Sequence, residues 1–475
     1  MLFNSLAFLC FFLIFFAVSW SLRGRPRIWF TLIASDVFYG WWDWRFLALL
    51  WFSTLFEFFI AQRLHDQEDL RKRKQLLVAS MSINLGLLGF FKYFNFFIAS
   101  GSSALHAMGL HVPPMVLEVV LPVGISFYTF QTMSYAIDVY RREVLPERDL
   151  LKFAASIALF VHLVAGPIVR ARHLLPQLAS DRTFDLEFAT SGLEQVLRGF
   201  FKKVVVADSL APLVDAWFRQ PGMFDGPSLL IAVYFYSFQI YCDFSGYTDI
   251  ALGCAKLLGY DLGVNFNRPY LATSFSEFWG RWHISLSSWL RDYLYIPLGG
   301  NRGGAWQTNR NLMLTMLLGG LWHGASWTFV VWGGLHGAYL VGQRLLSPGL
   351  ASLVRVLRVP SWLASLVGAL VVFHLTAVAW IFFRSPTFTV AWEVIRGITT
   401  RFTFSFEQVQ TKFLVLKGFA LIAVLFSSEW FGSRVWMEQR LAAHSAFRYA
   451  LAAAVLWALA LFGTFSGNNF IYFQF

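Results

Sequence analysis

Charged residues are scarce in this chain of 475 amino acids. Asp, Glu, Lys and Arg together make up 14% of it, and 57% of the residues are hydrophobic, against roughly 25% and 45–50% in soluble domains. No long polar stretch separates the apolar segments that recur from Leu2 to Phe465. These two shortages exclude an ordinary soluble protein and favour a single domain embedded in a lipid bilayer.

Cysteine is also rare, and the signatures of several enzyme classes are missing. The three cysteines, Cys10, Cys242 and Cys254, lie in apolar surroundings without zinc-site or CxxC spacing, so we expect no metal site. We find no Walker A loop, no GxSxG elbow and no HExxH helix. An internal repeat is missing too, which argues against a transporter built from repeated halves.

Basic residues are plentiful by comparison, and they occur in short runs between apolar segments. The net charge is +11, and runs containing Arg23 to Arg27, Arg71 to Lys74 and Arg141-Arg142 alternate with apolar segments. The positive-inside rule places these three loops in the cytoplasm and the N-terminus outside the cytoplasm. A basic face interleaved with polar groups, which nucleic-acid binding requires, is absent from this pattern.

The apolar segments predict an all-α polytopic membrane protein with about ten to twelve transmembrane helices. Residues 152–172 interrupt one segment with His, Gly, Pro and Arg, and residues 265–309 are too polar to face lipid. We interpret 265–309 as re-entrant or interfacial helices, because irregular backbone at membrane depth must be covered by protein or a cavity. Residues 28–60 contain two apolar segments, which the aromatic and charged turn Trp41–Arg45 separates. The remaining apolar segments are 2–20, 76–99, 115–140, 192–210, 228–258, 310–345, 362–383, 412–430 and 446–465.

The sharpest candidate for chemistry is His323, within Gly319-Gly320-Leu321-Trp322-His323-Gly324. An ionisable residue inside an apolar segment is costly, and it is therefore a functional candidate. A neutral imidazole accepts a proton from a hydroxyl near neutral pH, which suits acyl transfer. The neighbouring glycines would let a backbone or a ligand approach closely. The alternative is a packing histidine that is hydrogen-bonded to a backbone carbonyl.

A second candidate site lies between Trp279 and Gly300. It gathers Arg281, His283, Arg291, Asp292 and Tyr295 among tryptophans. This density indicates a polar lining in which the arginines bind phosphate or carboxylate through their planar guanidinium groups. The alternative is an interfacial helix whose arginines extend toward water.

Two carboxylates, Asp243 and Asp249, form a third cluster within an apolar stretch. They could pair with the arginines of the second site or orient a histidine, and structural pairing is the preferred interpretation. For His162, His336 and His374, which also lie in apolar segments, we favour packing or a local hydrogen bond.

Several of these segments resemble the bacterial branch of the membrane-bound O-acyltransferase (MBOAT) family. Within that branch the alginate acetyltransferases are nearest, and the D-alanyl transferases are more distant. The likeness covers most of the chain from Pro122 onward, with 1–475 as one membrane domain, 1–114 as N-terminal helices and 115–475 as the family core. The motifs that carry it are Pro122–Tyr128, Ala165–Ile168, Tyr241–Tyr247, Arg281–Ser287, Arg291–Gly300, Trp322–Gly324 and Phe470–Phe475.

The resemblance implies a ring of helices around a thin partition, with a central funnel that admits an acyl donor from the cytoplasm and an outer opening for the acceptor. His323 matches the family's catalytic histidine, and His283 matches its second polar residue. Whether His323 acts as a general base or becomes transiently acylated stays open. The residues expected to bind substrate are Trp322, Arg281, Arg291, Asp292, Tyr295 and Asp243.

The resemblance therefore implies a bacterial inner-membrane acetyltransferase with a periplasmic N-terminus. We expect it to take acetyl from cytoplasmic acetyl-CoA, without a tightly bound cofactor, and to pass it to an extracytoplasmic polysaccharide such as alginate. The transfer is direct or runs through a periplasmic acetyltransferase partner. The alternatives are transfer of D-alanyl or another acyl group, and a non-enzymatic transporter or flippase of a polysaccharide precursor.

Overall fold

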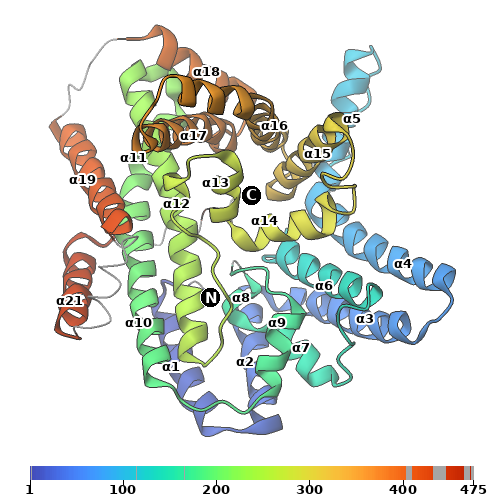
Figure 1. The fold of residues 1–475 in the computed structure, drawn as a ribbon. Coiled ribbons are helices and arrows are strands. Elements are labelled where there is room, and N and C mark those ends of the chain that lie inside the picture. The colour runs from blue at the N-terminus through green and yellow to red at the C-terminus, as the bar shows by residue number, and fades with distance from the viewer. Residues whose placement is uncertain are drawn as a thin grey trace. The chain divides into compact units, whose positions relative to one another are not determined.

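The computed structural model describes residues 1, 3–113, 115–164, 166–402, 409–431, 445–464 and 471. Within these ranges the chain forms helices and no β-strand, which confirms the all-α prediction (Figure 1). Contacts group the chain into two compact units. The first unit comprises Met1–Gly192 and Ala251–Gly263, and the second comprises Leu193–Ile250 and Val264–Phe475. The predicted single domain with a division after residue 114 stays a prediction.

The first unit is built from helices joined by short turns. Several of them begin with a side-chain cap, such as Ser5, Asp69 and Asp149, each of which accepts a hydrogen bond from a backbone N–H of the first helical turn. The elements are α1 (Leu6–Ser21), α2 (Gly24–Asp43), the 3₁₀ turn η1 (Trp44–Phe46), α3 (Leu47–Asp66), α4 (Leu70–Leu88), the π-helical η2 (Gly89–Tyr93), α5 (Phe94–Ala107), α6 (Ile125–Tyr140), α7 (Leu150–Ala158), α8 (Phe160–Leu163) and α9 (Ala171–Ala179).

The predicted span 115–140 is too long, because α6 begins only at Ile125. Gly124 precedes the helix with φ at +78°, in the left-handed region. A Cβ at this position would lie 2.6 Å from the carbonyl oxygen of Leu163, so only glycine fits here. The interrupted segment predicted for 152–172 is confirmed as two short helices, α7 and α8, followed by irregular backbone from Gly166 to Arg170.

A fully buried carboxylate links three helices of the first unit. Glu57 of α3 accepts hydrogen bonds from the hydroxyl of Ser80 at 3.0 Å and from the amide of Asn84 at 3.0 Å, both on α4. Thr132 of α6 donates to the side-chain oxygen of Asn84 at 3.1 Å. A buried carboxylate needs such donors, and the cluster therefore ties α3, α4 and α6 together.

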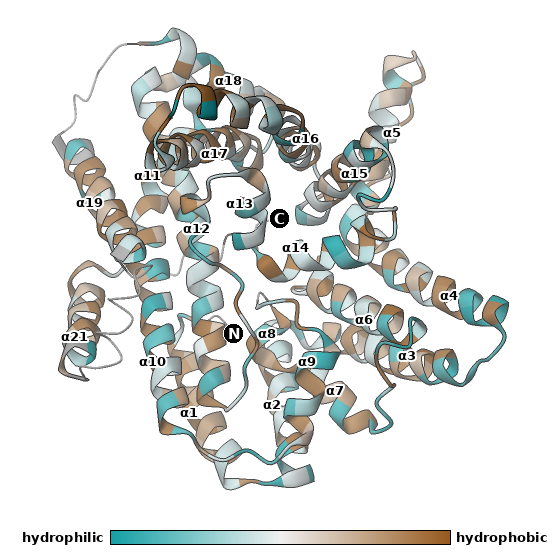
Figure 2. Cartoon of the chain, in the orientation of Figure 1, coloured by the Kyte–Doolittle hydropathy of each residue, from teal (hydrophilic) through white to brown (hydrophobic). Residues whose placement is uncertain are grey.

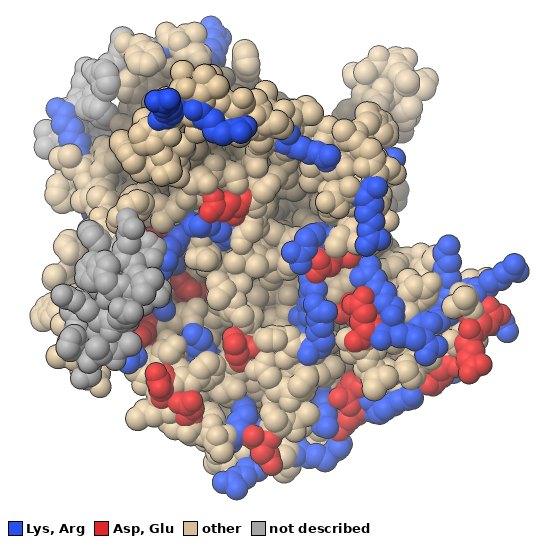
Figure 3. All heavy atoms as spheres, viewed as in Figure 1, with Lys and Arg blue, Asp and Glu red and all other residues tan. Residues whose placement is uncertain are grey.

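Charged side chains gather where α3 meets α4 (Figure 3). Arg63, Arg71, Lys72 and Lys74 are exposed there, and Arg148 from the segment before α7 pairs with Asp66 at 3.0 Å. The basic loop predicted from the sequence is thus an exposed charged end of these helices.

The second unit contains the longer helices of the C-terminal half. Two helices, α10 (Leu186–Phe200) and α12 (Gly226–Leu257), contribute residues to both units. The further elements are the π-helical η3 (Phe201–Ala207), α11 (Asp208–Arg219), η4 (Pro221–Met223), η5 (Pro269–Leu271), α13 (Phe275–Arg281), α14 (Ile284–Leu290), the π-helical η6 (Arg291–Tyr295), α15 (Ala305–His323), α16 (Trp327–Val356), α17 (Ser361–Arg384), α18 (Phe388–Thr400), α19 (Val409–Phe431) and α21 (Ser445–Phe462).

The predicted apolar segments of this unit are helical, with two corrections. Segment 310–345 is not one helix, because α15 ends at His323 and α16 starts at Trp327. Segment 192–210 is interrupted by the π-helical turn η3, a geometry that often marks functional sites. The short helices expected between 265 and 309 are confirmed as η5, α13, α14 and η6.

Four helical stretches are long and apolar enough to cross a membrane within the part of the chain that the structure describes. Two of them combine consecutive helices, and Figure 2 shows α17 and α19 largely in hydrophobic colours. The remaining helices carry more polar residues or are shorter, and the count of ten to twelve spans stays a prediction. The four stretches are Gly24–Asp66, Leu70–Ala107, Ser361–Arg384 and Lys412–Trp430.

Candidate active site

His323 is the last residue of α15 and lies at the corner where the chain turns into α16. The two helices touch at backbone level. A Cβ at Gly333 would lie 2.2 Å from the carbonyl oxygen of Met316, and one at Gly320 would lie 2.3 Å from that of Phe329. Glycine at both positions therefore allows the close approach that holds this corner, as the sequence predicted for Gly320.

The imidazole of His323 is packed among aromatic rings. Its ring centroid lies 5.0 Å from that of Trp322, 4.9 Å from Trp332 on α16 and 5.4 Å from Phe383 on α17. All three rings stand nearly edge-on to the imidazole. The His323 side chain is 4% exposed. The aromatic frame fixes the position of the ring.

His283 lies next to the same tryptophan. Its ring centroid is 6.0 Å from Trp322 and 4.7 Å from Phe244 of α12, and the residue is completely buried. The backbone of His283 has φ at +43°, a left-handed conformation that is uncommon for residues other than glycine. Trp322 thus contacts both predicted catalytic histidines, and the structure brings all three residues together.

The loop before α13 runs beside His283. The backbone N–H of Ile284 donates to the carbonyl of Asn265 at 2.8 Å, and the N–H of Asn267 donates to the carbonyl of Arg281 at 2.9 Å. The side-chain oxygen of Asn265 lies 3.3 Å from Nδ1 of His283 and accepts a hydrogen bond from the N–H of Ser285 at 3.1 Å. Asn265, which the sequence marked only as the boundary of a polar stretch, is therefore a direct neighbour of the imidazole.

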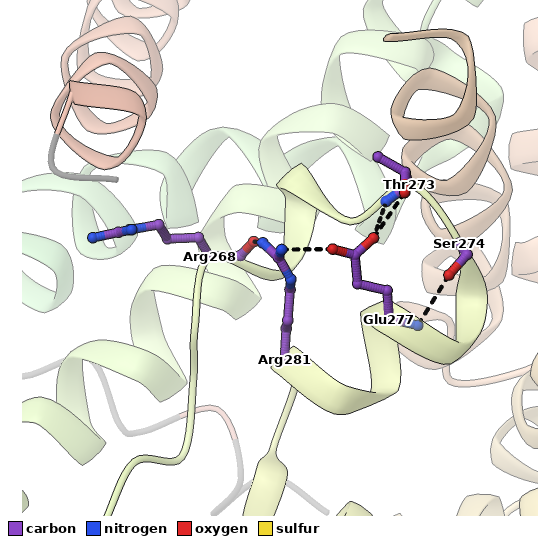
Figure 4. A network of polar contacts seen from close by, with 5 residues as sticks. All are labelled: Arg268, Thr273, Ser274, Glu277 and Arg281. Atoms are coloured by element: carbon purple, nitrogen blue, oxygen red, sulfur yellow. Dashed lines mark hydrogen bonds and ion pairs between the residues drawn. The ribbon is translucent and has the colours of Figure 1, made fainter. Parts of the chain in front are cut away.

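Arg281 belongs to a polar network that holds this loop against α13 (Figure 4). Its guanidinium pairs with Glu277 at 2.5 Å and lies 3.5 Å from the carbonyl oxygen of Arg268. Thr273 donates to the same carboxylate from its N–H at 2.7 Å and from its hydroxyl at 2.9 Å. Burial alone would raise the pKa of Glu277, but these hydrogen bonds and the Arg281 charge hold it below its usual value. Substrate binding by Arg281 stays a prediction.

The other predicted substrate-binding residues of this stretch lie in the π-helical turn η6. Arg291 is 63% exposed and pairs with its neighbour Asp292 at 2.7 Å. Tyr295 is half-buried at the end of the turn. An exposed guanidinium beside a carboxylate is accessible to an anionic ligand, and the substrate-binding role of all three residues stays a prediction.

Asp243 has a different partner from the arginines expected for it. Its carboxylate pairs with Lys203 of η3 at 2.5 Å and accepts a hydrogen bond from the N–H of Ile471 at 2.7 Å. Lys203 also pairs with Asp208 at 2.9 Å, and the three charged side chains are at most 5% exposed. We call Lys203, Asp208 and Asp243 the ionic cluster. Its contacts match the structural interpretation of Asp243.

Asp249, the other carboxylate of this stretch, pairs with the adjacent lysine. Lys202 lies 2.9 Å from it, and Gln195 donates to it at 3.1 Å. Both carboxylates of α12 therefore face η3. Two consecutive lysines in an apolar segment are a sequence signal for such buried ion pairs, although they do not identify the partners.

The three other histidines examined in the sequence have the expected packing roles. His162 is hydrogen-bonded to the carbonyl of Ser156 at 3.1 Å, and His374 to that of Leu370 at 2.7 Å. His336 is fully buried and stacks on Phe278 at 5.8 Å. These findings confirm packing or local bonding for each of them.

A sequence model described as MBOAT, membrane-bound O-acyltransferase family, matches residues 38–385. This range contains both histidines and the loop beside them.

Individual proteins match over most of the chain. The "Probable alginate O-acetylase AlgI" of Azotobacter vinelandii is 43% identical over 83% of this chain and 77% of its own. The protein of the same name from Pseudomonas aeruginosa is 40% identical over 93% of this chain and 83% of its own. The "Peptidoglycan O-acetyltransferase" of Helicobacter pylori is 34% identical over 78% of this chain and 73% of its own.

Proposed function

Because the chain belongs to the membrane-bound O-acyltransferase family and is thereby an O-acyltransferase of the membrane, we propose that it acetylates an extracytoplasmic polysaccharide. Alginate is the first candidate acceptor, since the relatives with 40–43% identity carry the name alginate O-acetylase. Peptidoglycan is the second, on the 34% identity to an enzyme named for it. The family assignment sets aside the alternative of a non-enzymatic transporter.

The proposed donor is acetyl-CoA from the cytoplasm of a bacterium. The exposed basic end of α3 and α4 supports this orientation, because Lys and Arg loops tend to stay on the cytoplasmic side. The N-terminus then faces the periplasm across the inner membrane. Acetyl reaches the polymer directly or through a periplasmic acetyltransferase partner.

The observation that carries the proposal is the pair of buried imidazoles that both contact Trp322. In the proposed reaction, the neutral ring of His323 takes the proton from the acceptor hydroxyl. The hydroxyl oxygen attacks the thioester carbonyl at the same time. The carbon–sulfur bond breaks, and the CoA thiolate leaves and takes up the proton from the imidazolium. His283 orients the reacting groups.

The test uses purified protein in lipid nanodiscs. The protein is incubated with acetyl-labelled acetyl-CoA and with either alginate or peptidoglycan fragments, and the label on the acceptor is measured. Changing His323→Ala should lower label transfer at least about 100-fold, the contribution of a general base. His374→Ala is the matched control, because that histidine is exposed and hydrogen-bonded to the carbonyl of Leu370 on its own helix. It should keep wild-type activity.

Full activity of the His323→Ala protein would remove this imidazole from the reaction. If label accumulates on His323 when the acceptor is omitted, the reaction runs through an acyl-histidine intermediate and the general-base step is wrong. A wild-type protein that leaves acetyl-CoA untouched but transfers D-alanyl groups would overturn the choice of acyl group. Relatives named teichoic acid D-alanyltransferase are 30–31% identical over less than half of this chain, and we therefore expect acetyl.

A further inference from the structure

We infer that Asn265 is a positioning residue that holds His283 as the tautomer protonated at Nδ1, so that Nε2 is its basic nitrogen. The inference rests on the proposed function only for the consequence in turnover. The protonation state itself follows from the hydrogen bonds around the ring.

The side-chain amide of Asn265 has one orientation that fits its neighbours. Its Oδ1 atom lies 3.1 Å from the backbone nitrogen of Ser285. A backbone N–H can only donate, so the atom facing it must be an acceptor. If the amide were turned over, its NH₂ group would face another donor. The amide oxygen therefore points toward Ser285 and His283, independently of any choice about the imidazole.

The hydroxyl of Ser285 also has one orientation that fits its neighbours. Its oxygen lies 2.8 Å from Oδ1 of Asn265 and 3.4 Å from Nδ1 of His283. The shorter contact has the usual length of an O–H···O hydrogen bond. The hydroxyl proton is thus directed to Asn265, and the Ser285 oxygen presents only lone pairs to the imidazole.

The tautomer follows from these two orientations. Nδ1 of His283 lies 3.3 Å from Oδ1 of Asn265 and 3.4 Å from the hydroxyl oxygen of Ser285. Both atoms act as acceptors toward the ring, and an unprotonated Nδ1 would place lone pairs against each other. A proton on Nδ1 turns both contacts into attractive ones. In a neutral imidazole the other nitrogen, Nε2, is then the one that accepts protons.

The backbone keeps Asn265 in this place. Its carbonyl accepts from the N–H of Ile284 at 2.8 Å. The segment from Asn265 to α13 is fixed further along by Arg281, Glu277 and Thr273 (Figure 4). His283 itself has a left-handed backbone, and local conformations of that kind persist only when their surroundings enforce them. The surroundings enforce one orientation of the ring relative to Asn265.

Nitrogen NMR on lipid-reconstituted protein with ¹⁵N-labelled histidine tests the tautomer directly. The His283 signals are assigned as those lost in His283→Gln. We expect Nδ1 to resonate as a protonated nitrogen and Nε2 as an unprotonated one. The opposite pattern in the wild-type protein would overturn the inference, whatever the enzyme activity is. If acetyl transfer is absent but the expected pattern is found, the inference is supported and only the proposed function fails.

Three variants connect the tautomer to turnover. Asn265→Leu removes the acceptor at similar size, and we expect mixed His283 tautomers. We expect kcat to fall about tenfold or less, below the roughly 100- to 10,000-fold effect of a general acid or base, because part of the His283 population keeps the right tautomer. Asn265→Asp keeps an acceptor oxygen and should keep the wild-type signals. Ser285→Ala removes one of the two acceptors that face Nδ1 of His283 and retains the backbone N–H that orients Asn265. Asn265 still accepts from Nδ1 in this variant, so we expect Nδ1 to stay protonated. Unchanged signals and unchanged kcat in a folded Asn265→Leu protein would contradict the inference. Should the Asn265→Leu protein fail to fold, the wild-type and Asn265→Asp spectra still show which nitrogen of His283 carries the proton.

Discussion

The ionic cluster and the histidine site, by which we mean His283 and His323, both lie in the second unit and are similarly buried, but their surroundings differ. Lys203 meets two carboxylates, Asp208 and Asp243, within hydrogen-bond distance. His323 and His283 pack against aromatic rings. A charge in low dielectric requires an opposite charge, whereas a neutral imidazole can be buried among rings and still accept a proton. We therefore expect the ionic cluster to contribute mainly to stability and the two histidines mainly to turnover.

The largest effect is expected from breaking the ionic cluster. Lys203→Met would leave two buried carboxylates facing each other without their cation, which costs about 3–5 kcal/mol when one partner of a buried pair is removed. The detergent-solubilised protein should show a strongly lowered thermal unfolding midpoint or fail to accumulate.

The matched control neutralises the whole cluster by combining Lys203→Met with Asp208→Asn and Asp243→Asn. This triple variant leaves no buried carboxylate without a cation. We therefore expect it to be more stable than Lys203→Met alone. If the single variant unfolds like the wild type, the cluster does not hold the fold, and a functional role for Asp243 gains weight.

The next largest effect concerns turnover and not stability. His283→Ala should reduce acetyl transfer about 10- to 100-fold, less than His323→Ala, because it removes orientation and leaves the base in place. Its unfolding midpoint should change far less than that of Lys203→Met. A variant that loses its fold and its activity together would place His283 with the structural groups.

A smaller effect is expected in the first unit. Glu57→Gln keeps an acceptor oxygen for Ser80 and Asn84. It also removes the cost of burying a charge, which offsets part of the stability lost with any broken hydrogen bond. We expect a change in unfolding free energy of about 1 kcal/mol and unchanged acetyl transfer. Loss of activity in a stable Glu57→Gln protein would show that this carboxylate has a functional role as well.

The smallest effect is expected for His336. Both of its ring nitrogens are buried without a hydrogen-bond partner in the part of the chain that the structure describes. Phe at this position keeps the stacking on Phe278, and an apolar group of similar shape removes the unsatisfied nitrogens. His336→Phe should therefore retain activity and be as stable as the wild type or slightly more so. An inactive but folded variant would add His336 to the histidine site.

Helical structure and the position of most helices followed from hydropathy, because each apolar segment must form its backbone hydrogen bonds internally. Helix ends were less predictable. The start of α6 depends on Gly124, whose left-handed backbone is forced by contact with Leu163, and no local pattern reveals a contact between distant residues. The corner at His323 was hidden in one apolar run for the same reason.

The candidate site could be predicted where it contains residue types that are rare in this chain. His323 stood out as an imidazole in an apolar segment, and His283 as part of a polar cluster among tryptophans. The structure places both beside Trp322. The partners of Asp243 and the neighbour of His283 were not predictable, because Lys203 and Asn265 come from other elements that only the fold brings together.

In the proposed reaction, His323 catalyses acetyl transfer between reactants that approach from opposite sides of a membrane. Sealed proteoliposomes with acetyl-labelled acetyl-CoA on one side and the polysaccharide on the other measure this directly. We predict label on the polymer for the wild-type protein and essentially none for His323→Ala. Equal labelling by the two proteins, or labelling only when both reactants share one compartment, would contradict the claim.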